Sequence, residues 1–235
     1  MKKIGIIGAM ELEVEALKAR LAQPVITTRA GMQFYEGTLN GAAVVVVQCG
    51  VGKVNAALCV QILADLFSVT HIINTGVAGS LNATLDIGDI LVSSDALQHD
   101  MDVSPLGYAP GQIPGLDRLA FAADETMVQL ALEACAQVNP DIRAMAGRVV
   151  SGDQFISDNG VKERLISLFH GDCAEMEGAS IAQGAWLNGI PFVVVRAISD
   201  KADGSAELDY PTFEKLAAAN CAAVTEALAA RLAKE

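Results

Sequence analysis

The chain has 235 residues, of which 52% are hydrophobic and 19% are charged. This composition excludes a disordered chain, and the length suits one large α/β domain spanning residues 1–235. The formal net charge of −12 disfavours nucleic acid as a partner, so a neutral or cationic small molecule fits better.

The five cysteines form no C-x-x-C pair, and small apolar residues surround most of them. We therefore expect buried free thiols in a reducing cytoplasm. The N-terminal apolar run is short and is closed by Glu11 and Glu13, which favours a first strand over a signal peptide. No apolar stretch is long enough to span a bilayer, so no membrane association is expected.

Short β-branched runs alternate along the chain with longer segments of helical spacing. The expected strands are residues 4–7, 43–47, 71–74, 90–92, 148–150 and 192–198. The expected helices are residues 13–22, 54–67, 125–138, 162–169, 179–188 and 210–233. This alternation predicts an α/β fold with a largely parallel or mixed sheet that helices cover. Asn40-Gly41, between residues 34–39 and 42–47, predicts a β-hairpin turn.

Ligand sites in open α/β sheets collect at the carboxyl ends of the strands. After the first strand, Glu13 either complements the dipole of the following helix or acts as a general base. Residues 74–80 predict a strand that runs into a glycine-rich turn containing Ala78 and Gly79. Such a turn either lets the backbone approach a ligand closely or has only a structural role.

Two further segments could be mistaken for familiar sites. The Gly50-Val51-Gly52-Lys53 segment lacks the Ser or Thr that must follow Lys53, so a Walker phosphate site is rejected. Residues 98–119, rich in Pro and Gly, predict a long ordered loop of the kind that is often functional. Its His99-Asp100 start favours a solvated or pocket-lining loop over a metal site.

The last two strand ends carry the most unusual charges. Glu175 and Glu177 lie two apart before an Ala-rich helix, and in extended backbone they share one face. Either they are functional or they cap the helix. Arg196 and Asp200 lie four apart on a buried strand, so both could line a pocket. Partial burial would raise the pKa of Asp200, as an acid working near neutrality requires, although Asp200 could also be a cap.

Together these segments resemble the bacterial 5′-methylthioadenosine/S-adenosylhomocysteine nucleosidases. The matching stretches are IGIIGAMELEVE, GVGKVNAA, INTGVAGSL, GDILVSSDALQHDMDV, VSGDQFI, EMEGASIA and PFVVVRAISD. They cover nearly the whole chain in the order of the family. RAISD and EMEGA are shared with the wider nucleoside phosphorylase superfamily, whereas GAMELE with Glu13 points to its hydrolytic branch.

The resemblance implies a three-layer α/β/α fold of the nucleoside phosphorylase type with a central mixed sheet. It implies that Asp200, helped by Ser199, protonates adenine N7, that Glu13 activates water and that Glu177 holds the ribose hydroxyls. Further substrate contacts are implied at Val51, Ala78, Gly79, Phe155, Ile156, Met176, Arg196 and Tyr210. No metal and no organic cofactor are required.

The resemblance also implies a homodimer in which residues 98–119 close the pocket of the partner through Val103, Leu106 and Pro114. Two positions depart from the family. Val77 stands where some members carry a serine that contacts the attacking water, and Leu106 replaces a common aromatic residue. A nucleoside phosphorylase and a nucleoside-binding protein without activity are the alternatives. The ranking of methylthioadenosine, adenosylhomocysteine, 5′-deoxyadenosine and aminodeoxyfutalosine stays open.

Overall fold

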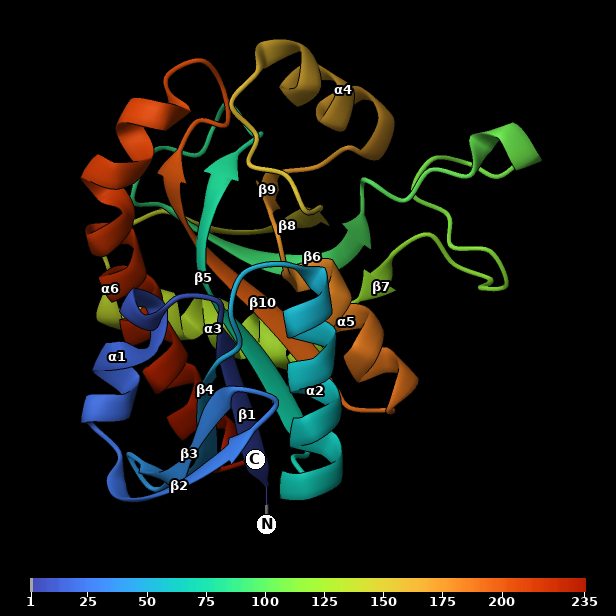
Figure 1. The fold of residues 1–235 in the computed structure, drawn as a ribbon. Coiled ribbons are helices and arrows are strands. Elements are labelled where there is room, and N and C mark those ends of the chain that lie inside the picture. Colours follow the sequence, from blue (N-terminus) through green and yellow to red (C-terminus); the bar gives the residue numbers. More distant parts are fainter. Residues whose placement is uncertain (1) are drawn as a thin grey trace.

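A computed structural model describes residues 2–235 as a ten-stranded mixed sheet between two layers of helices (Figure 1). The strands are β1 (Lys3–Gly8), β2 (Ala22–Arg29), β3 (Met32–Leu39), β4 (Ala42–Gln48), β5 (His71–Ser80), β6 (Ile90–Gln98), β7 (Phe121–Ala122), β8 (Ala144–Ser151), β9 (Cys173–Glu175) and β10 (Phe192–Asp200). The helices are α1 (Glu11–Ala19), α2 (Lys53–Phe67), the 3₁₀ turn η1 (Ser104–Leu106), α3 (Glu125–Val138), α4 (Asn159–Phe169), α5 (Gly178–Leu187) and α6 (Ala206–Leu232).

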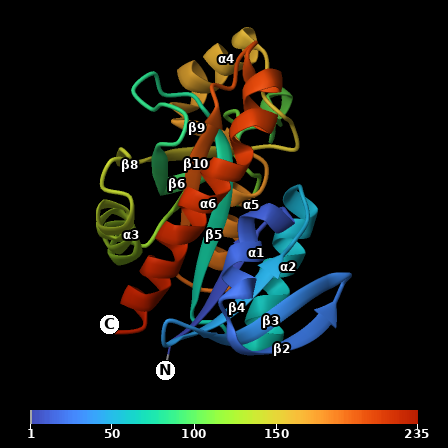
Figure 2. The same cartoon turned by 90° about the vertical axis from the view of Figure 1, so that its left-hand side faces the viewer.

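The helices cover the sheet on both faces. Helices α1, α3 and α6 pack on one face (Figure 2), and α2 and α5 pack against each other on the other. Helices α3 and α4 begin in the same way. Asp124 caps α3 by accepting a hydrogen bond from Met127 N at 2.9 Å, and Asp158 caps α4 by accepting one from Val161 N at 3.0 Å. The three-layer α/β/α architecture that the resemblance implied is confirmed.

The sheet runs in the order β10-β6-β8-β9-β5-β1-β4-β3-β2, and a further pairing of β10 with β5 closes one end on itself. Strand β5 pairs with β10 along one edge. Its other edge pairs with β1 up to Asn74 and with β9 only from Gly79 onward. Within residues 2–235, the intervening edge at 75–78 has no neighbouring strand, and the candidate site opens there.

The predicted strands and helices are present, with shifted ends. The hairpin is confirmed: Leu39 pairs with Ala42, and Asn40 and Gly41 have positive φ values of 48° and 85°. The first helix ends earlier than predicted, because Ala22 already begins β2. Strand β2 was not predicted; nearly all of its residues are exposed, so it lacks the buried alternation that marks a strand.

The prediction of a glycine-rich turn at residues 74–80 is wrong, because β5 continues as a strand to Ser80. Neither Gly76 nor Gly79 is among the residues with positive φ. The glycines are needed for a different reason, which is that side chains of the site approach the backbone where a Cβ would otherwise lie.

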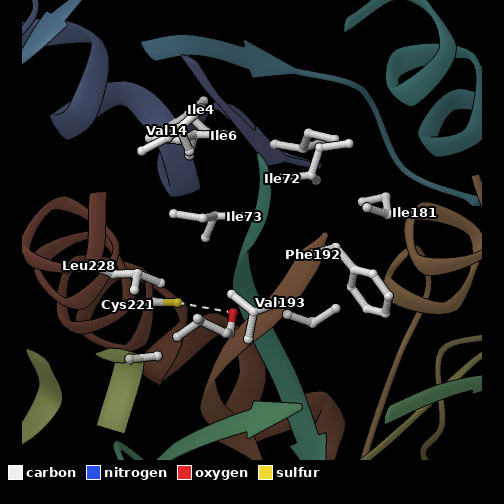
Figure 3. Close-up of a cluster of buried hydrophobic side chains, with 14 of the residues drawn as sticks. Ile4, Ile6, Val14, Ile72, Ile73, Ile181, Phe192, Val193, Cys221 and Leu228 are labelled. Carbon is white, nitrogen blue, oxygen red and sulfur yellow. Dashed lines mark hydrogen bonds between the residues drawn. The ribbon is translucent and has the colours of Figure 1, made fainter. Parts of the chain in front are cut away.

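The core consists mainly of Ile, Val, Leu and Ala from the strands and the facing helix sides (Figure 3). Ile6, Ile73 and Val193 are fully buried in the sheet, and Leu228 packs from α6. All five cysteines are free and buried, as expected. Among residues 2–235, no helix combines the length and the apolar character needed to cross a bilayer.

Candidate active site

A cavity of about 240 Å³ lies where the carboxyl ends of β1, β4, β5, β9 and β10 come together. The residues predicted for the site that line it are Glu13, Val51, Ala78, Gly79, Phe155, Ile156, Met176, Glu177, Ser199, Asp200 and Tyr210. Ala9, Met10, Val77, Gln154, Ala174, Glu175 and Ala202 complete the lining. Most residues of this second group carry small or apolar side chains, so no sequence pattern marked them. They line the cavity because they are neighbours of the predicted residues.

Glu13 lies in the first turn of α1 and is 2% exposed. Its Oε2 accepts hydrogen bonds from Ala9 N at 2.7 Å and Met10 N at 2.9 Å, and its Oε1 accepts one from Val77 N at 3.1 Å. Burial raises the pKa of Glu13, whereas Arg196 and these backbone donors oppose the rise. The side chain therefore stabilises the start of the helix, as expected, and it also faces the cavity, where its role as a general base stays a prediction.

Gly76 lets Glu13 and Arg196 approach each other across β5. A Cβ at this position would lie 2.2 Å from Arg196 Nη1 and 2.3 Å from Glu13 Oε1. Any side chain would therefore displace both charged groups. Among the described residues, no salt bridge joins Glu13 to Arg196, although both side chains reach toward the open position at Gly76.

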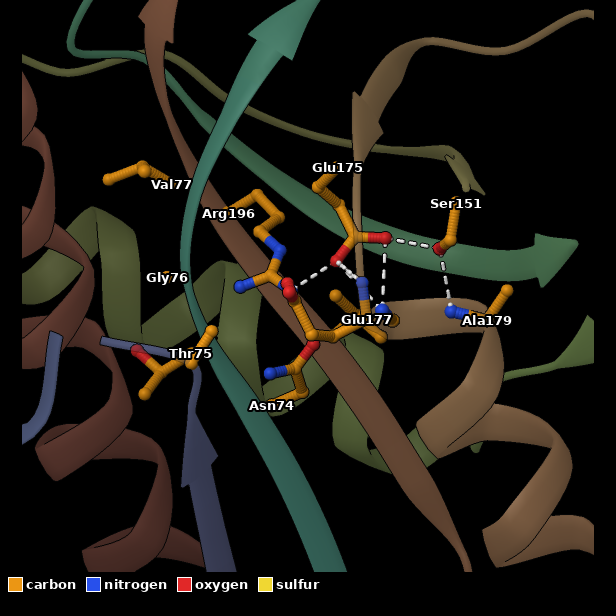
Figure 4. A network of polar contacts seen from close by, with 12 residues as sticks. Asn74, Thr75, Gly76, Val77, Ser151, Glu175, Glu177, Ala179 and Arg196 are labelled. Atoms are coloured by element: carbon orange, nitrogen blue, oxygen red, sulfur yellow. Dashed lines mark hydrogen bonds and ion pairs between the residues drawn. The ribbon is translucent and has the colours of Figure 1, made fainter. Parts of the chain in front are cut away.

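Glu175 and Glu177 both line the cavity and both lie near Arg196 Nη2, but they have different hydrogen-bond partners (Figure 4). The carboxylate of Glu175 folds back and accepts hydrogen bonds from Glu177 N at 3.1 Å and Gly178 N at 2.7 Å. It also contacts Ser151 and Arg196. Glu175 thus caps α5, because the unpaired N–H groups at a helix start attract a carboxylate.

Glu177 points toward the 50–53 turn instead, and its Oε1 accepts a hydrogen bond from Gly52 N at 2.8 Å. Burial raises the pKa of Glu177 to about 7; the negative charge of Glu175 adds to the rise, and Arg196 opposes it. A carboxyl group with this pKa changes its charge near neutral pH when a ligand or a neighbouring charge changes.

Arg196 does not line the cavity, contrary to the prediction from its spacing to Asp200. The register of β10 against β5 shifts between Ile198 and Asp200, and this irregularity breaks the alternation that would put both side chains on one face. Arg196 is 1% exposed and lies beneath the carboxylates. Its Nη2 donates to Asn74 Oδ1 at 2.6 Å, pairs with Glu175 and lies 3.8 Å from Glu177 Oε2.

Asp200 ends β10 at the opposite side of the cavity. Its Oδ1 accepts a hydrogen bond from Ala202 N at 2.8 Å, and its Oδ2 lies 2.9 Å from Ser199 Oγ. A Cβ on Gly79 would come within 2.7 Å of Asp200 Oδ1, so this glycine is also needed for close approach. Burial raises the pKa of Asp200, although the Ala202 and Ser199 hydrogen bonds oppose it, and the predicted direction is confirmed.

An aromatic pair closes one wall of the cavity. The rings of Phe155 and Tyr210 meet edge to face with centroids 5.6 Å apart, and the Tyr210 hydroxyl lies 3.3 Å from Met10 Sδ. Phe155 and Val51 are about half exposed, so the cavity has an apolar mouth. A flat apolar wall opposite a carboxyl group suits a planar heterocycle with nitrogen acceptors at its edge.

The loop residues Val103, Leu106 and Pro114 do not line the cavity of their own chain. The loop between β6 and β7 extends away from the body of the molecule (Figure 1), and Leu106 is 76% exposed. Across residues 2–235, no group of three or more His, Cys, Asp or Glu side chains is arranged to hold a metal ion.

Comparisons with known proteins agree with this geometry. The family model of the phosphorylase superfamily matches residues 3–230. The chain is 40% identical over 233 residues to a 5′-methylthioadenosine/S-adenosylhomocysteine nucleosidase of Halalkalibacterium halodurans. The aligned residues cover 99% of this chain and 100% of the relative.

Two crystal structures of nucleosidases with the same name are also similar. The enzyme from Colwellia psychrerythraea in complex with adenine has a TM-score of 0.94 and 38% identity, covering 98% of this chain and 96% of that chain. The Neisseria meningitidis enzyme in complex with methylthio-immucillin-A has a TM-score of 0.94 and 34% identity, covering 98% of this chain and 100% of that chain. The chain therefore belongs to the phosphorylase superfamily and, within it, to the 5′-methylthioadenosine/S-adenosylhomocysteine nucleosidase family of N-glycosyl hydrolases.

Proposed function

We propose that this protein hydrolyses the N-glycosidic bond of 5′-methylthioadenosine and S-adenosylhomocysteine, releasing adenine and the 5′-thio-substituted ribose. The observation that carries the proposal is that Glu13, Glu177 and Asp200 line one small cavity that also has an aromatic wall. These groups provide the base, the sugar-binding carboxylate and the acid that this hydrolysis needs. The relatives named for these substrates support the choice of nucleoside.

Asp200 acts as the general acid. Adenine leaves poorly as an anion, so a proton delivered to N7 allows it to leave as a neutral base when the bond between C1′ and N9 breaks. Burial raises the pKa of Asp200, which favours the protonated form that this step requires. Ser199 lies against Asp200 Oδ2 and holds the carboxyl group in orientation.

Glu13 acts as the general base. Departure of adenine leaves a cationic sugar, and a water molecule adds its hydroxide to C1′ while Glu13 takes the proton. Glu13 lines the cavity, and backbone N–H groups hold its carboxylate in place for this water. Val77 provides only its backbone N–H, which orients Glu13, so the water is held without a serine hydroxyl at this position.

Glu177 binds the 2′- and 3′-hydroxyls of the ribose, and Met176 packs against the sugar. The carboxylates at this end of the cavity also stabilise the positive charge that develops on the sugar. Phe155 stacks on adenine, the backbone of Ile156 contacts the base, and Ala78 and Gly79 form the floor. Val51 and Tyr210 accept the apolar 5′ substituent.

Hydrolysis is favoured over phosphorolysis by the charge of the cavity. Among residues 2–235, no lysine or arginine lines it, and the nearby Arg196 is already surrounded by carboxylates. A phosphate dianion would need a free cation at this place. We expect adenine release from methylthioadenosine in phosphate-free buffer, at a rate that added phosphate leaves unchanged. Strict dependence on phosphate would contradict hydrolysis.

The active unit is a homodimer in which the loop of each chain closes the pocket of its partner through Val103, Leu106 and Pro114. Two features support this proposal. The loop exposes Leu106 away from its own chain, and Val51, which lines the cavity, is 49% exposed. A measured mass in solution tests the dimer, and a monomer with full activity would contradict the role of the loop.

A further inference from the structure

An ion pair that the proposed chemistry does not use holds the root of the long loop. Lys53 Nζ lies 2.6 Å from Asp100 Oδ1, and their side chains are only 19% and 16% exposed. Lys53 Nζ also donates a hydrogen bond to Gln98 Oε1 at 3.1 Å. The expected solvated or pocket-lining loop start is wrong at this point. His99 is buried and does not line the cavity, and Asp100 is tied to the start of α2.

The ion pair is part of a ring of contacts that joins three segments. Asp100 Oδ2 accepts a hydrogen bond from Asp153 N at 3.0 Å. Asp153 Oδ1 in turn accepts one from Lys53 N at 2.9 Å. The root of the loop, the first residue of α2 and the turn after β8 are therefore held together by Lys53, Asp100 and Asp153.

The start of α2 and the turn after β8 both lie next to residues of the cavity. Gly52, directly before Lys53, donates its N–H to Glu177 Oε1 at 2.8 Å. The carbonyl oxygen of Lys53 accepts a hydrogen bond from Ser180 Oγ at 2.9 Å, in the first turn of the helix that Glu177 precedes. Phe155 follows Asp153 by two residues. A shift of Lys53 would therefore move the amide that orients Glu177.

The ring also has little freedom to adjust. Gly52 has a φ of 98°, and a Cβ there would lie 3.1 Å from Asp153 Oδ1. Burial would raise the pKa of Asp100, but hydrogen bonds from Lys53 and the Asp153 backbone hold it below its ordinary value. Asp100 is therefore a carboxylate at neutral pH. A partly buried ion pair fixes geometry because losing one partner leaves the other without its counter-charge.

We propose that Lys53 and Asp100 are positioning residues that hold the Gly52 N–H on Glu177 and thereby set the preference for a ribose that carries its 2′-hydroxyl. They also tie the root of the 99–120 loop to the sugar end of the cavity of the same chain. This inference rests on the proposed role of Glu177 as the ribose-binding group.

The test compares methylthioadenosine with its 2′-deoxy analogue in the wild type and in Asp100→Asn. We expect KM for methylthioadenosine to rise about tenfold, the factor typical for one hydrogen bond to a charged group, while kcat changes less than about threefold. The preference for the 2′-hydroxyl should fall by a similar factor. Lys53→Arg keeps the charge and should retain most of the preference.

The matched control is Asp95→Asn, which breaks the similarly buried ion pair of Asp95 with Arg148 away from the cavity. This variant should lose stability but keep KM and the 2′-hydroxyl preference. An unchanged preference in Asp100→Asn, or an equal loss in Asp95→Asn, would overturn the inference.

Two further measurements distinguish a failure of this inference from a failure of the variant to fold and from a failure of the proposed function. Should Asp100→Asn fail to fold, Lys53→Met/Asp100→Leu replaces the pair by apolar groups, an exchange that proteins often tolerate, and it should show the same loss of preference. Adenine release by the wild type tests the proposed function by itself. Should release be absent, calorimetric binding of the two nucleosides measures the preference directly, and equal wild-type affinities would overturn the inference.

Discussion

The two ends of the cavity stabilise their buried carboxyl groups in opposite ways. At the sugar end, Glu13, Glu175 and Glu177 gather around Arg196. At the other end, Asp200 has no salt-bridge partner among residues 2–235 and is surrounded by backbone, Ser199 and small residues. A shared cation favours carboxylates that attract a developing positive charge. Burial without a cation favours a carboxyl group that retains its proton. Burial raises the pKa of the carboxyl groups at both ends, and only at the sugar end does Arg196 oppose this rise.

The largest expected effect comes from removing the isolated acid. Asp200→Asn should lower adenine release by ~10²–10⁴-fold, the usual contribution of a general acid, while binding of the nucleoside largely survives. Steady-state turnover and equilibrium binding measure the two separately. Asp203→Asn, three residues further on in the same loop region, is the control and should retain turnover. A loss of less than a few fold in Asp200→Asn would contradict its role and favour a protein that only binds nucleosides.

The second effect addresses the close approach of Glu13 and Arg196 to the backbone at Gly76. Gly76→Ala places a methyl group 2.2 Å from Arg196 Nη1 and 2.3 Å from Glu13 Oε1, so both must move and the proposed base loses its orientation. We expect kcat to fall about 100-fold and stability to fall by ~1–3 kcal/mol, as overpacking usually costs. Gly5→Ala is the control, since its Cβ meets only apolar side chains, those of Leu63 at 3.0 Å and Val69 at 3.6 Å. Equal activities of the two variants would show that the close approach is not needed.

The third effect is a change in the pH dependence of stability. The pKa of Glu177 rises from 4.5 to about 7 in the folded protein, so its protonation favours folding. The stability that depends on this proton is fully present below pH 4.5 and is lost as the pH rises through about 7, by about 3 kcal/mol at most. Urea unfolding at pH 5 and pH 8 should therefore show a smaller difference for Glu177→Gln than for the wild type. Glu133→Gln, at an exposed surface pair, should behave like the wild type.

The smallest effect concerns the loop, which contributes to neither end of the cavity in its own chain. Leu106→Ala should raise KM for methylthioadenosine only several fold and leave kcat unchanged, because a rim contact to the 5′ substituent binds ground state and transition state alike. Leu216→Ala, exposed on α6 at 58%, is the control. An unchanged KM for Leu106→Ala would remove the loop from substrate binding.

Much of the fold follows from short-range patterns. β-Branched runs in the sequence predict the buried strands β1, β4 and β10. Asn40-Gly41 predicts its hairpin because few other dipeptides adopt two positive φ values. Strand β2 was not predicted, because it is an exposed edge strand without buried alternation and its register against β3 is irregular. Strand β9, with three residues, is too short for any period to show.

The sequence predicted part of the candidate site. Glu13, Glu177 and Asp200 stand out because charged residues are rare at the ends of buried strands, and the family resemblance assigned them roles. Arg196 was wrongly expected to line the pocket, and the choice between a functional role and a helix cap stayed open for Glu175. A strand period alone cannot foresee an irregularity in register or a side chain that folds back onto a helix start.

The sequence by itself determined the alternating strands and helices, the buried thiols and the identity of the polar residues at the strand ends. These depend on local periodicity and on the cost of burying charge, both of which are properties of a short segment. Only the tertiary structure decided that Arg196 lies under the cavity, that Gly76 and Gly79 work by lacking a Cβ, and that Lys53 reaches Asp100. These features depend on contacts between segments far apart in the chain, where a single shift in register redirects a side chain.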